Sequence, residues 1–138
     1  MDSLCPRYHR SANMTQRNFV GLIYNPQVPA SSGLVHSLVK SLELEGAAWV
    51  GPSDSIDTTK DQWKNASVMV VVGGDGTILR AARATAPFGI PIVGINMGRA
   101  GFMTELSVEN ALDKLPEYLQ GNLRVEKRMM LQATISSD

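Results

Sequence analysis

The chain has 138 residues, 43% of them hydrophobic, a size and composition that suit one globular domain. Its 13 Lys and Arg residues balance its 13 Asp and Glu residues, giving a formal net charge of +0. This balance argues against a nucleic-acid partner or a polybasic membrane surface, and no apolar run approaches the roughly 18 residues of a transmembrane helix.

The first 18 residues are polar and lack the apolar centre of a secretion signal. We expect residues 1–18 to form a disordered tail and the protein to be cytoplasmic, although a short transit peptide is the alternative for this weakly basic segment. The single Cys5 cannot form an internal disulfide, as is typical of a reducing compartment.

The first half of the ordered region alternates strand and helix patterns. Phe19–Tyr24 is an apolar run that ends at the turn signal Asn25–Pro26, and Ser31 or Ser32 is placed to cap a helix that Gly46 would end. We further expect a short strand at 47–50 and a weak helical turn near 60–64.

The second half contains two glycine-containing loops, each after a strand pattern. Residues 68–72 predict a buried strand that runs into Gly73–Thr77 and then into a helix over 77–84. Residues 92–95 predict a fourth strand, followed by the loop Asn96–Gly101. Because the carboxyl ends of parallel strands lie at one edge of a sheet, we expect both loops to face one crevice.

The rest of the chain predicts one helix and then two strands. Ser107 is placed to cap the helix, Pro116 to shorten or kink it, and Gly121 to close it. Residues 123–127 and 130–135 look like strands, the second with one solvent-facing side.

These elements predict an α/β fold: a mostly parallel, doubly wound sheet with flanking helices over 19–122. Residues 123–138 change character and read as the first strands of a β-rich domain that is missing from this chain. An unpaired edge strand at 130–135 would favour aggregation.

The pentapeptide Gly73-Gly74-Asp75-Gly76-Thr77 carries the chemistry. Glycine permits positive φ and close approach to a ligand, and a helix start presents free N–H groups to phosphate. Asp75 could act as a general base, hydrogen-bond a ribose or help to hold Mg²⁺, and Thr77 could cap the helix or contact phosphate. No Walker A motif occurs. The alternative is a plain strand-to-helix turn.

The sequence Gly-Gly-Asp-Gly-Thr-Ile-Leu-Arg-Ala-Ala-Arg resembles the signature of NAD kinases. Residues 94–106, Gly-Ile-Asn-Met-Gly-Arg-Ala-Gly-Phe-Met-Thr-Glu-Leu, resemble the second segment of that family. Asn25–Pro26 and the Arg-Met-Met-Leu at 128–131 also match the family in order and spacing. Diacylglycerol and sphingosine kinases share the pentapeptide, so the second segment carries the specificity.

The resemblance implies phosphorylation of the 2′-hydroxyl of the adenosine ribose of NAD, which gives NADP. The donor would be ATP or polyphosphate, with a divalent cation such as Mg²⁺. It implies that Asp75 is the catalytic acid–base residue and that Asp75, Gly76, Arg80 and Phe102 bind NAD. Gly73, Gly74 and Thr77 would form the phosphate loop.

Some of these residues have simpler structural explanations. Arg80 could lie on a solvated helix face, Phe102 could be a core aromatic, and Glu105 could pair with Arg99 or cap a turn. The two histidines, His9 and His36, have no partner spacing, so no protein metal site is expected.

The chain resembles only the N-terminal half of the family, whose members are dimers or tetramers. The expected function is therefore NAD kinase, with activity of the isolated chain in question. Two alternatives stay open: a diacylglycerol-type lipid kinase, and a nucleotide-binding module without catalysis.

Overall fold

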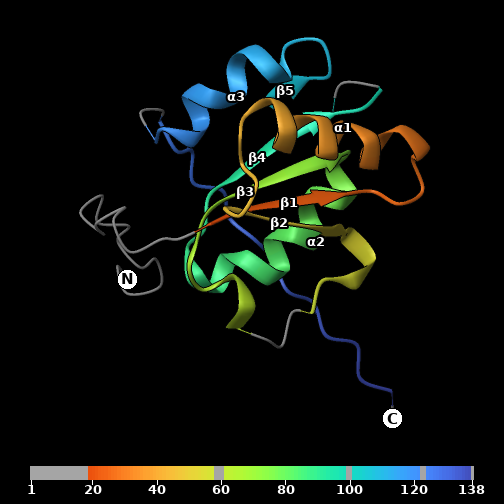
Figure 1. Cartoon of the computed structure of the whole chain (residues 1–138). Coiled ribbons are helices and arrows are strands. Elements are labelled where there is room, and N and C mark those ends of the chain that lie inside the picture. Colours follow the sequence, from red (N-terminus) through yellow and green to blue (C-terminus); the bar gives the residue numbers. More distant parts are fainter. Residues whose placement is uncertain (1–18, 58–60, 99–100, 122–123, 138) are drawn as a thin grey trace.

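The computed structural model describes residues 19–57, 61–98, 101–121 and 124–137. It is an α/β fold built on one five-stranded sheet in the order β2-β1-β3-β4-β5, in which every neighbouring pair is parallel (Figure 1). The predicted parallel sheet is therefore confirmed. The strands are β1 Phe19–Tyr24, β2 Ala48–Pro52, β3 Ala66–Gly73, β4 Ile92–Asn96 and β5 Leu106–Ser107.

Helices cover both faces of the sheet, as a doubly wound fold requires. The α-helices are α1 Pro29–Ser41, α2 Asp75–Thr85 and α3 Ala111–Leu119, and the short 3₁₀ turns are η2 Ser53–Ser55, η3 Asp61–Trp63 and η4 Ala86–Phe88. Leu38 of α1 and Leu115 of α3 share one buried cluster with alternate residues of β1 and β3. Ile78 and Ala81 of α2 pack with the other set of alternate residues, so α2 lies on the opposite face from α1 and α3 (Figure 1). Trp63 of η3 belongs to the same cluster.

The central strand explains why the sheet has this order. Every residue of β3 except Ser67 is buried, and four of its eight residues are valines. A continuous β-branched run of this kind suits a strand that is covered on both faces and paired on both edges. The strand β3 accordingly lies between β1 and β4.

The first helix begins and ends at different residues from those predicted. It starts at Pro29, with no side-chain cap, because proline at the first helical position has its φ angle already set. Ser31 lies inside the first turn, where its hydroxyl donates to the Asn25 and Val28 carbonyls at 2.6 and 2.7 Å. The helix stops at Ser41 because Glu43 takes a left-handed φ of 53°.

The third helix starts four residues later than the predicted cap at Ser107. Ser107 belongs instead to the short strand β5, which the sequence did not suggest, and its N–H donates to Asn110 Oδ1 at 2.8 Å. The helix includes Pro116 and ends at Leu119, and Gly121 follows with a φ of 73°.

The two C-terminal strands predicted at 123–127 and 130–135 are not formed in the described residues 124–137. Residues 124–137 form no regular secondary structure and are exposed throughout. A strand needs a partner for its backbone hydrogen bonds, and these residues have none in the sheet described above. The predicted tail, 1–18, lies outside the described residues.

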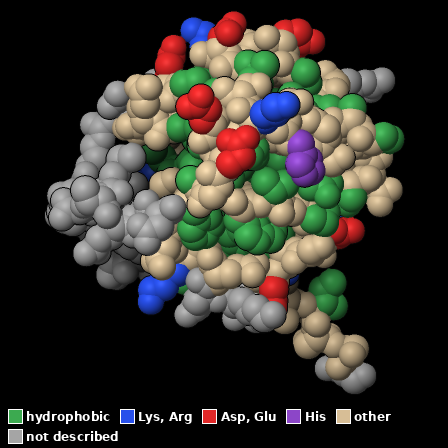
Figure 2. All heavy atoms as spheres, viewed as in Figure 1, with side chains coloured by type: hydrophobic (Ala, Val, Ile, Leu, Met, Phe, Trp, Pro, Cys, Tyr) green, Lys and Arg blue, Asp and Glu red, His purple; other side chains and the backbone are tan. Residues whose placement is uncertain are grey.

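The described surface mixes charges of both signs. Figure 2 shows acidic and basic side chains interspersed among apolar ones. His36 of α1 is exposed. Within the described ranges, no helix combines the length and apolar character needed to cross a membrane.

Candidate functional site

The candidate site lies at the edge of the sheet where the strands end. Parallel pairing places Tyr24 of β1 opposite Val72 of β3, and Gly73 of β3 opposite Asn96 of β4. The segments that follow these strands therefore leave the sheet side by side. This is the edge at which open α/β sheets bind their ligands.

The glycine pentapeptide uses its glycines for space and not for the positive φ angles that glycine permits. Within the described chain, positive φ at glycine occurs only at three residues elsewhere: Gly46, Gly89 and Gly121. A Cβ on Gly73 would lie 2.7 Å from Thr77 Oγ1, whereas Cβ atoms on Gly74 and Gly76 would meet nothing within 4 Å. Gly73 thus lets the helix turn tightly, and the other two leave the backbone open to a ligand.

The start of α2 offers free hydrogen-bond donors. Gly74 occupies the N-cap position, and Thr77 does not cap the helix as one prediction proposed. The N–H groups of Thr77 and Ile78 donate to the Gly74 carbonyl at 3.1 Å each. Those of Asp75 and Gly76 have no acceptor among the described residues. Such N–H groups at a helix N-terminus attract anions.

Asp75 joins the two glycine-containing loops. Its Oδ2 accepts a hydrogen bond from the Phe102 N–H at 3.1 Å, and its Oδ1 accepts one from the Met103 N–H at 3.0 Å. The two donors fix the plane of the carboxylate and compensate part of its charge. Each oxygen retains a second lone-pair direction that can take a proton from a substrate. The predicted meeting of the two loops is confirmed.

Two glycines make this contact possible. A Cβ on Gly101 would collide with Asp75 Oδ1 and lie 3.0 Å from its Cγ. A Cβ on Gly94 of β4 would lie 2.7 Å from Ile78 Cδ1 and 3.1 Å from the Met103 carbonyl. Glycine at both positions therefore lets α2 approach the second loop closely.

Glu105 closes the second loop against β4. Its carboxylate accepts from the Gly94 N–H at 2.7 Å, and its own N–H donates to the Gly94 carbonyl at 3.0 Å. Its predicted partner Arg99 lies outside the described residues. Asn96 supports the loop backbone, because its Oδ1 accepts from the Gly98 N–H at 2.7 Å.

Phe102 is not a core aromatic. Its side chain is 93% exposed, directly beside the backbone N–H that binds Asp75. An exposed ring at a ligand-facing edge is available for stacking, and burying it against a flat partner would be favourable.

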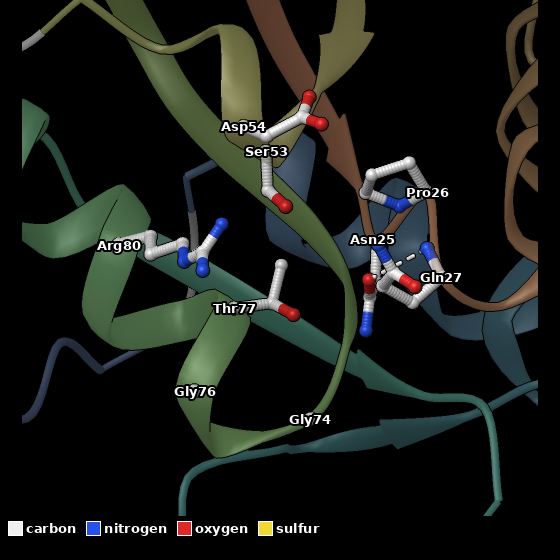
Figure 3. A pocket seen from close by; sticks show the side chains of 9 residues that line it. All are labelled: Asn25, Pro26, Gln27, Ser53, Asp54, Gly74, Gly76, Thr77 and Arg80. Atoms are coloured by element: carbon white, nitrogen blue, oxygen red, sulfur yellow. Dashed lines mark hydrogen bonds between the residues drawn. The ribbon is translucent and has the colours of Figure 1, made fainter.

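A pocket opens on the other side of the α2 start. It has a volume of about 320 Å³, and Figure 3 shows the side chains around it. Its lining comes from the segments after β1, β2 and β3 and from α2: Asn25, Pro26, Gln27, Ser53, Asp54, Gly74, Gly76, Thr77 and Arg80. Asp75 and Phe102 do not line it, so the first turn of α2 separates two neighbouring surfaces.

Two residues that are largely buried turn their hydroxyls toward this pocket, where the hydroxyls have no partner among the described residues. Ser53 is 5% exposed and Thr77 is 6% exposed, and both side chains point into the pocket in Figure 3. Neither hydroxyl makes a hydrogen bond to any described residue. Both hydroxyls are therefore available to a ligand that enters the pocket.

The pocket carries one cation and one carboxylate. Arg80 extends from α2 into the space between Thr77 and Ser53, while Asp54 lies away from Gly74 and Gly76 (Figure 3). Over the ranges that the structure covers, no group of three or more His, Cys, Asp or Glu could hold a metal ion.

Sequence reasoning missed the roles of Ser53, Asp54 and Gln27 at this pocket. Their signal is positional, since they follow the carboxyl ends of β2 and β1. Asn25 was noted only as a turn residue. Its backbone N–H donates to the Val72 carbonyl at 3.1 Å, and its Oδ1 accepts from the Gln27 N–H at 3.0 Å, which fixes this wall.

Comparison with known proteins agrees with the two-loop arrangement. Residues 26–123 match the family described as ATP-NAD kinase N-terminal domain. The chain is 38% identical over 115 residues to an NAD kinase of Dehalococcoides mccartyi, covering 83% of this chain and 40% of that relative. It is 34% identical over 126 residues to one of Symbiobacterium thermophilum, covering 85% and 44%.

A yeast NADH kinase, solved in complex with NADH, shares the fold with a TM-score of 0.50 at 17% identity, covering 74% of this chain and 38% of that one. The chain thus spans less than half the length of these relatives. The family match covers strands β2 to β5, both glycine-containing loops and the Asp75 contact between them. The chain belongs to the NAD kinase family, of which it represents the N-terminal domain.

Proposed function

We propose that this chain is the nucleotide-binding part of an NAD kinase that transfers a phosphoryl group to the 2′-hydroxyl of the adenosine ribose of NAD. The observation that carries the proposal is the Asp75 carboxylate, held by the Phe102 and Met103 N–H groups between the two family motifs. This contact fixes an acid–base group where an acceptor hydroxyl and a phosphate site can meet.

The proton and the phosphoryl group are transferred next to each other at the start of α2, where Asp75 is flanked by the open glycines Gly74 and Gly76. Asp75 takes the proton of the ribose hydroxyl as that oxygen attacks the terminal phosphorus of the donor. The bond from phosphorus to the leaving phosphate oxygen then breaks. The free N–H groups at the helix start and the Arg80 guanidinium compensate the negative charge of the donor.

Phe102 is assigned to the acceptor side. Its ring is exposed and adjacent to Asp75, so an adenine stacked on it would bring the attached ribose toward the carboxylate. Gly76, open to solvent at the same turn, leaves room for the sugar.

Mg²⁺ is proposed to accompany the phosphate donor. Magnesium sites in kinases commonly use one or two carboxylates plus substrate phosphates, which suits a pocket with a single carboxylate. The cation would supply charge compensation on the transferring phosphate. A homo-oligomer and a cytoplasmic location stay predictions from the sequence.

The test is a fusion of this chain to the remaining C-terminal part of the Dehalococcoides mccartyi relative. We expect the fusion to form NADP from NAD with ATP or polyphosphate and Mg²⁺, detected by a coupled NADP-specific dehydrogenase. The full-length relative is the positive control for the assay.

A folded fusion that forms no NADP would contradict the proposal and favour a module without catalysis. NAD binding to the 138-residue chain, measured by saturation-transfer NMR, provides a second test that does not depend on the fusion. Phosphorylation of diacylglycerol in place of NAD would favour the lipid-kinase alternative.

A further inference from the structure

The Glu105 side chain binds a backbone donor of β4 just outside the region where β4 and β5 pair. The register of these strands begins with Ile95 opposite Leu106, so β5 gives Gly94 no partner in that register. In a regular ladder, a backbone carbonyl of the neighbouring strand would accept the Gly94 N–H. Here the Glu105 carboxylate accepts it at 2.7 Å, and the Glu105 N–H donates to the Gly94 carbonyl at 3.0 Å. Glu105 therefore binds both polar groups of Gly94.

This arrangement leaves the backbone before Glu105 free to face Asp75. The Met103 carbonyl and the Thr104 Cα each lie 3.1 Å from the point that a Gly94 Cβ would occupy, so this segment packs directly on the glycine. Because the carboxylate already accepts the Gly94 N–H, no other carbonyl of the segment has to turn toward β4 to satisfy that donor. The Phe102 and Met103 N–H groups bind the Asp75 carboxylate instead, at 3.1 and 3.0 Å.

The second loop has a side-chain contact at each end, and the contact of Glu105 is the nearer one to Asp75. At the start of the loop, Asn96 Oδ1 accepts from the Gly98 N–H at 2.7 Å. At its end, Glu105 follows closely after the two residues that donate to Asp75. Glu105 is exposed, so its contribution is the accepted hydrogen bond and not the burial of apolar surface.

We infer that Glu105 is a positioning residue for phosphoryl transfer, which acts through Gly94 and Met103 to hold the two N–H groups that orient the Asp75 carboxylate. The inference rests on the proposed function and adds a residue to it that binds neither substrate. Within the described chain, Glu105 makes no hydrogen bond to Asp75 and does not line the pocket beside α2.

The first experiment observes the two donors directly in the 138-residue chain. Proton–nitrogen NMR compares the Phe102 and Met103 amide signals of the unmodified chain with those of Glu105→Ala and Glu105→Gln, and Asp75→Ala shows where the signals lie without the acceptor. We expect Glu105→Ala to shift both amide protons toward their positions in Asp75→Ala and to speed their hydrogen exchange about tenfold. Glu105→Gln retains an accepting oxygen, so both signals should stay near those of the unmodified chain.

Glu109→Ala is the matched control, because Glu109 is also an exposed glutamate and makes no hydrogen bond or ion pair to a described residue. It should leave both amide signals in place. If circular dichroism shows that Glu105→Ala is unfolded, Glu105→Met replaces it, since methionine has a similar length and lacks a strong acceptor.

Two NMR results would overturn the inference. Unchanged Phe102 and Met103 signals in a folded Glu105→Ala chain would show that the loop holds its donors without the carboxylate. Equal shifts in Glu105→Ala and Glu105→Gln would show that the negative charge of Glu105 acts, and not the hydrogen bond that it accepts.

Turnover of the fusion protein, measured below the unfolding transition of each variant, tests the effect on the reaction. Glu105→Ala should lower kcat about tenfold, because small displacements of a catalytic group are costly. The KM for ATP should stay constant, because no described residue of the second loop lines the pocket beside α2. Glu105→Gln should restore most of kcat, and an unchanged kcat in Glu105→Ala would overturn the inference.

The two experiments separate this inference from the proposed function. If the fusion forms no NADP, yet the Phe102 and Met103 signals of the chain depend on Glu105, the proposed function fails and the control of the loop by Glu105 stands. If the unmodified fusion forms NADP and Glu105→Ala changes neither the signals nor kcat, the proposed function stands and the role of Glu105 fails.

Discussion

The Asp75 carboxylate has two tasks that one substitution can separate. It is placed to accept the substrate proton, and it also holds the Phe102 and Met103 N–H groups. An asparagine has the same shape but only one accepting atom, so one N–H would face an amide NH₂ group.

We predict that Asp75→Asn lowers kcat of the fusion at least about 100-fold, because general base catalysis is lost. The unfolding free energy should fall by only about 1–3 kcal/mol, the usual cost of a lost charge-assisted hydrogen bond. NADP formation and thermal unfolding measure the two effects. A kcat near that of the unmodified protein would exclude Asp75 as the base.

Phe102→Ala tests the acceptor side without disturbing the core. Since the ring is 93% exposed, the free energy of unfolding should change by less than about 0.5 kcal/mol. The KM for NAD should rise about tenfold, as loss of a stacked base costs about 1–3 kcal/mol. The KM for ATP should stay constant, and an unchanged KM for NAD would contradict the stacking role.

Gly101→Ala tests whether the second loop must approach Asp75 so closely. The new methyl group would collide with Asp75 Oδ1, so this oxygen and the Met103 N–H that it binds cannot both keep their positions. We expect kcat to fall at least about tenfold, because small displacements of catalytic groups are costly. Gly98→Ala is the matched control in the same loop, since its Cβ would meet nothing within 4 Å. Equal activity of the two variants would contradict this reading.

For single residues, the sequence predicted that the two glycine-containing loops meet but not which atoms make the contact. Residue types and order identified Asp75 and both loops. The resemblance could not show that Asp75 binds two backbone N–H groups of the second loop, because that contact joins residues 27 and 28 positions apart. The residue types could not show which property of glycine the pentapeptide uses: Gly73 avoids a collision of a Cβ with Thr77, and none of the three glycines takes a positive φ.

At the level of helices and strands, the packing of α2 against β4 brings the two glycine-containing loops into contact. Gly94 has no Cβ to separate Ile78 of α2 from the strand, and Glu105 closes the following loop on the same residue. The helix start and the second loop are therefore held by one short segment of β4.

We predict that Gly94→Ala destabilises the protein by about 1–3 kcal/mol, because an added methyl group overpacks this contact. The contact atoms are Ile78 Cδ1 at 2.7 Å and the Met103 carbonyl at 3.1 Å, and a backbone carbonyl cannot move aside easily. Denaturant unfolding followed by tryptophan fluorescence measures the change.

The control for Gly94→Ala is Gly33→Ala in the exposed part of α1, where a Cβ would meet nothing within 4 Å. This change should stabilise by about 0.5–1 kcal/mol, because alanine favours a helix interior. Equal stabilisation by both substitutions would show that Gly94 is not a packing position.

Element boundaries were harder to predict than element types. The strands β1, β3 and β4 follow continuous apolar runs, which a buried parallel sheet produces directly. The start of α1 was missed because Pro29 begins the helix without a side-chain cap. Its end was missed because Glu43 adopts the left-handed conformation usually taken by glycine, with the Leu44 N–H donating to the Val39 carbonyl at 2.9 Å.

For the whole molecule, the sheet and its helices form both clusters of buried residues without residues 124–137. That segment carries exposed apolar side chains, among them Met129 at 87%, Leu131 at 88% and Ile135 at 97% exposure. Apolar and polar residues alternate in this segment, which suggested strands, but the segment pairs with no strand of the described sheet. Local pattern alone cannot supply the hydrogen bonds that a strand needs.

We predict that deleting residues 124–138 leaves the unfolding free energy of the chain within about 0.5 kcal/mol, because no residue of 124–137 is buried. Deletion should also lower self-association, since exposed apolar segments promote contacts between molecules. Light scattering over a concentration series, with thermal unfolding of both forms, measures the two effects.

Leu131→Asp in the undeleted chain should give part of the same decrease in self-association. Gln132→Asp adds the same charge without removing an apolar side chain, so it should give a smaller decrease. A large loss of stability on deletion would show that 124–138 contributes to the fold. Unchanged self-association would show that another exposed surface drives the contacts between molecules.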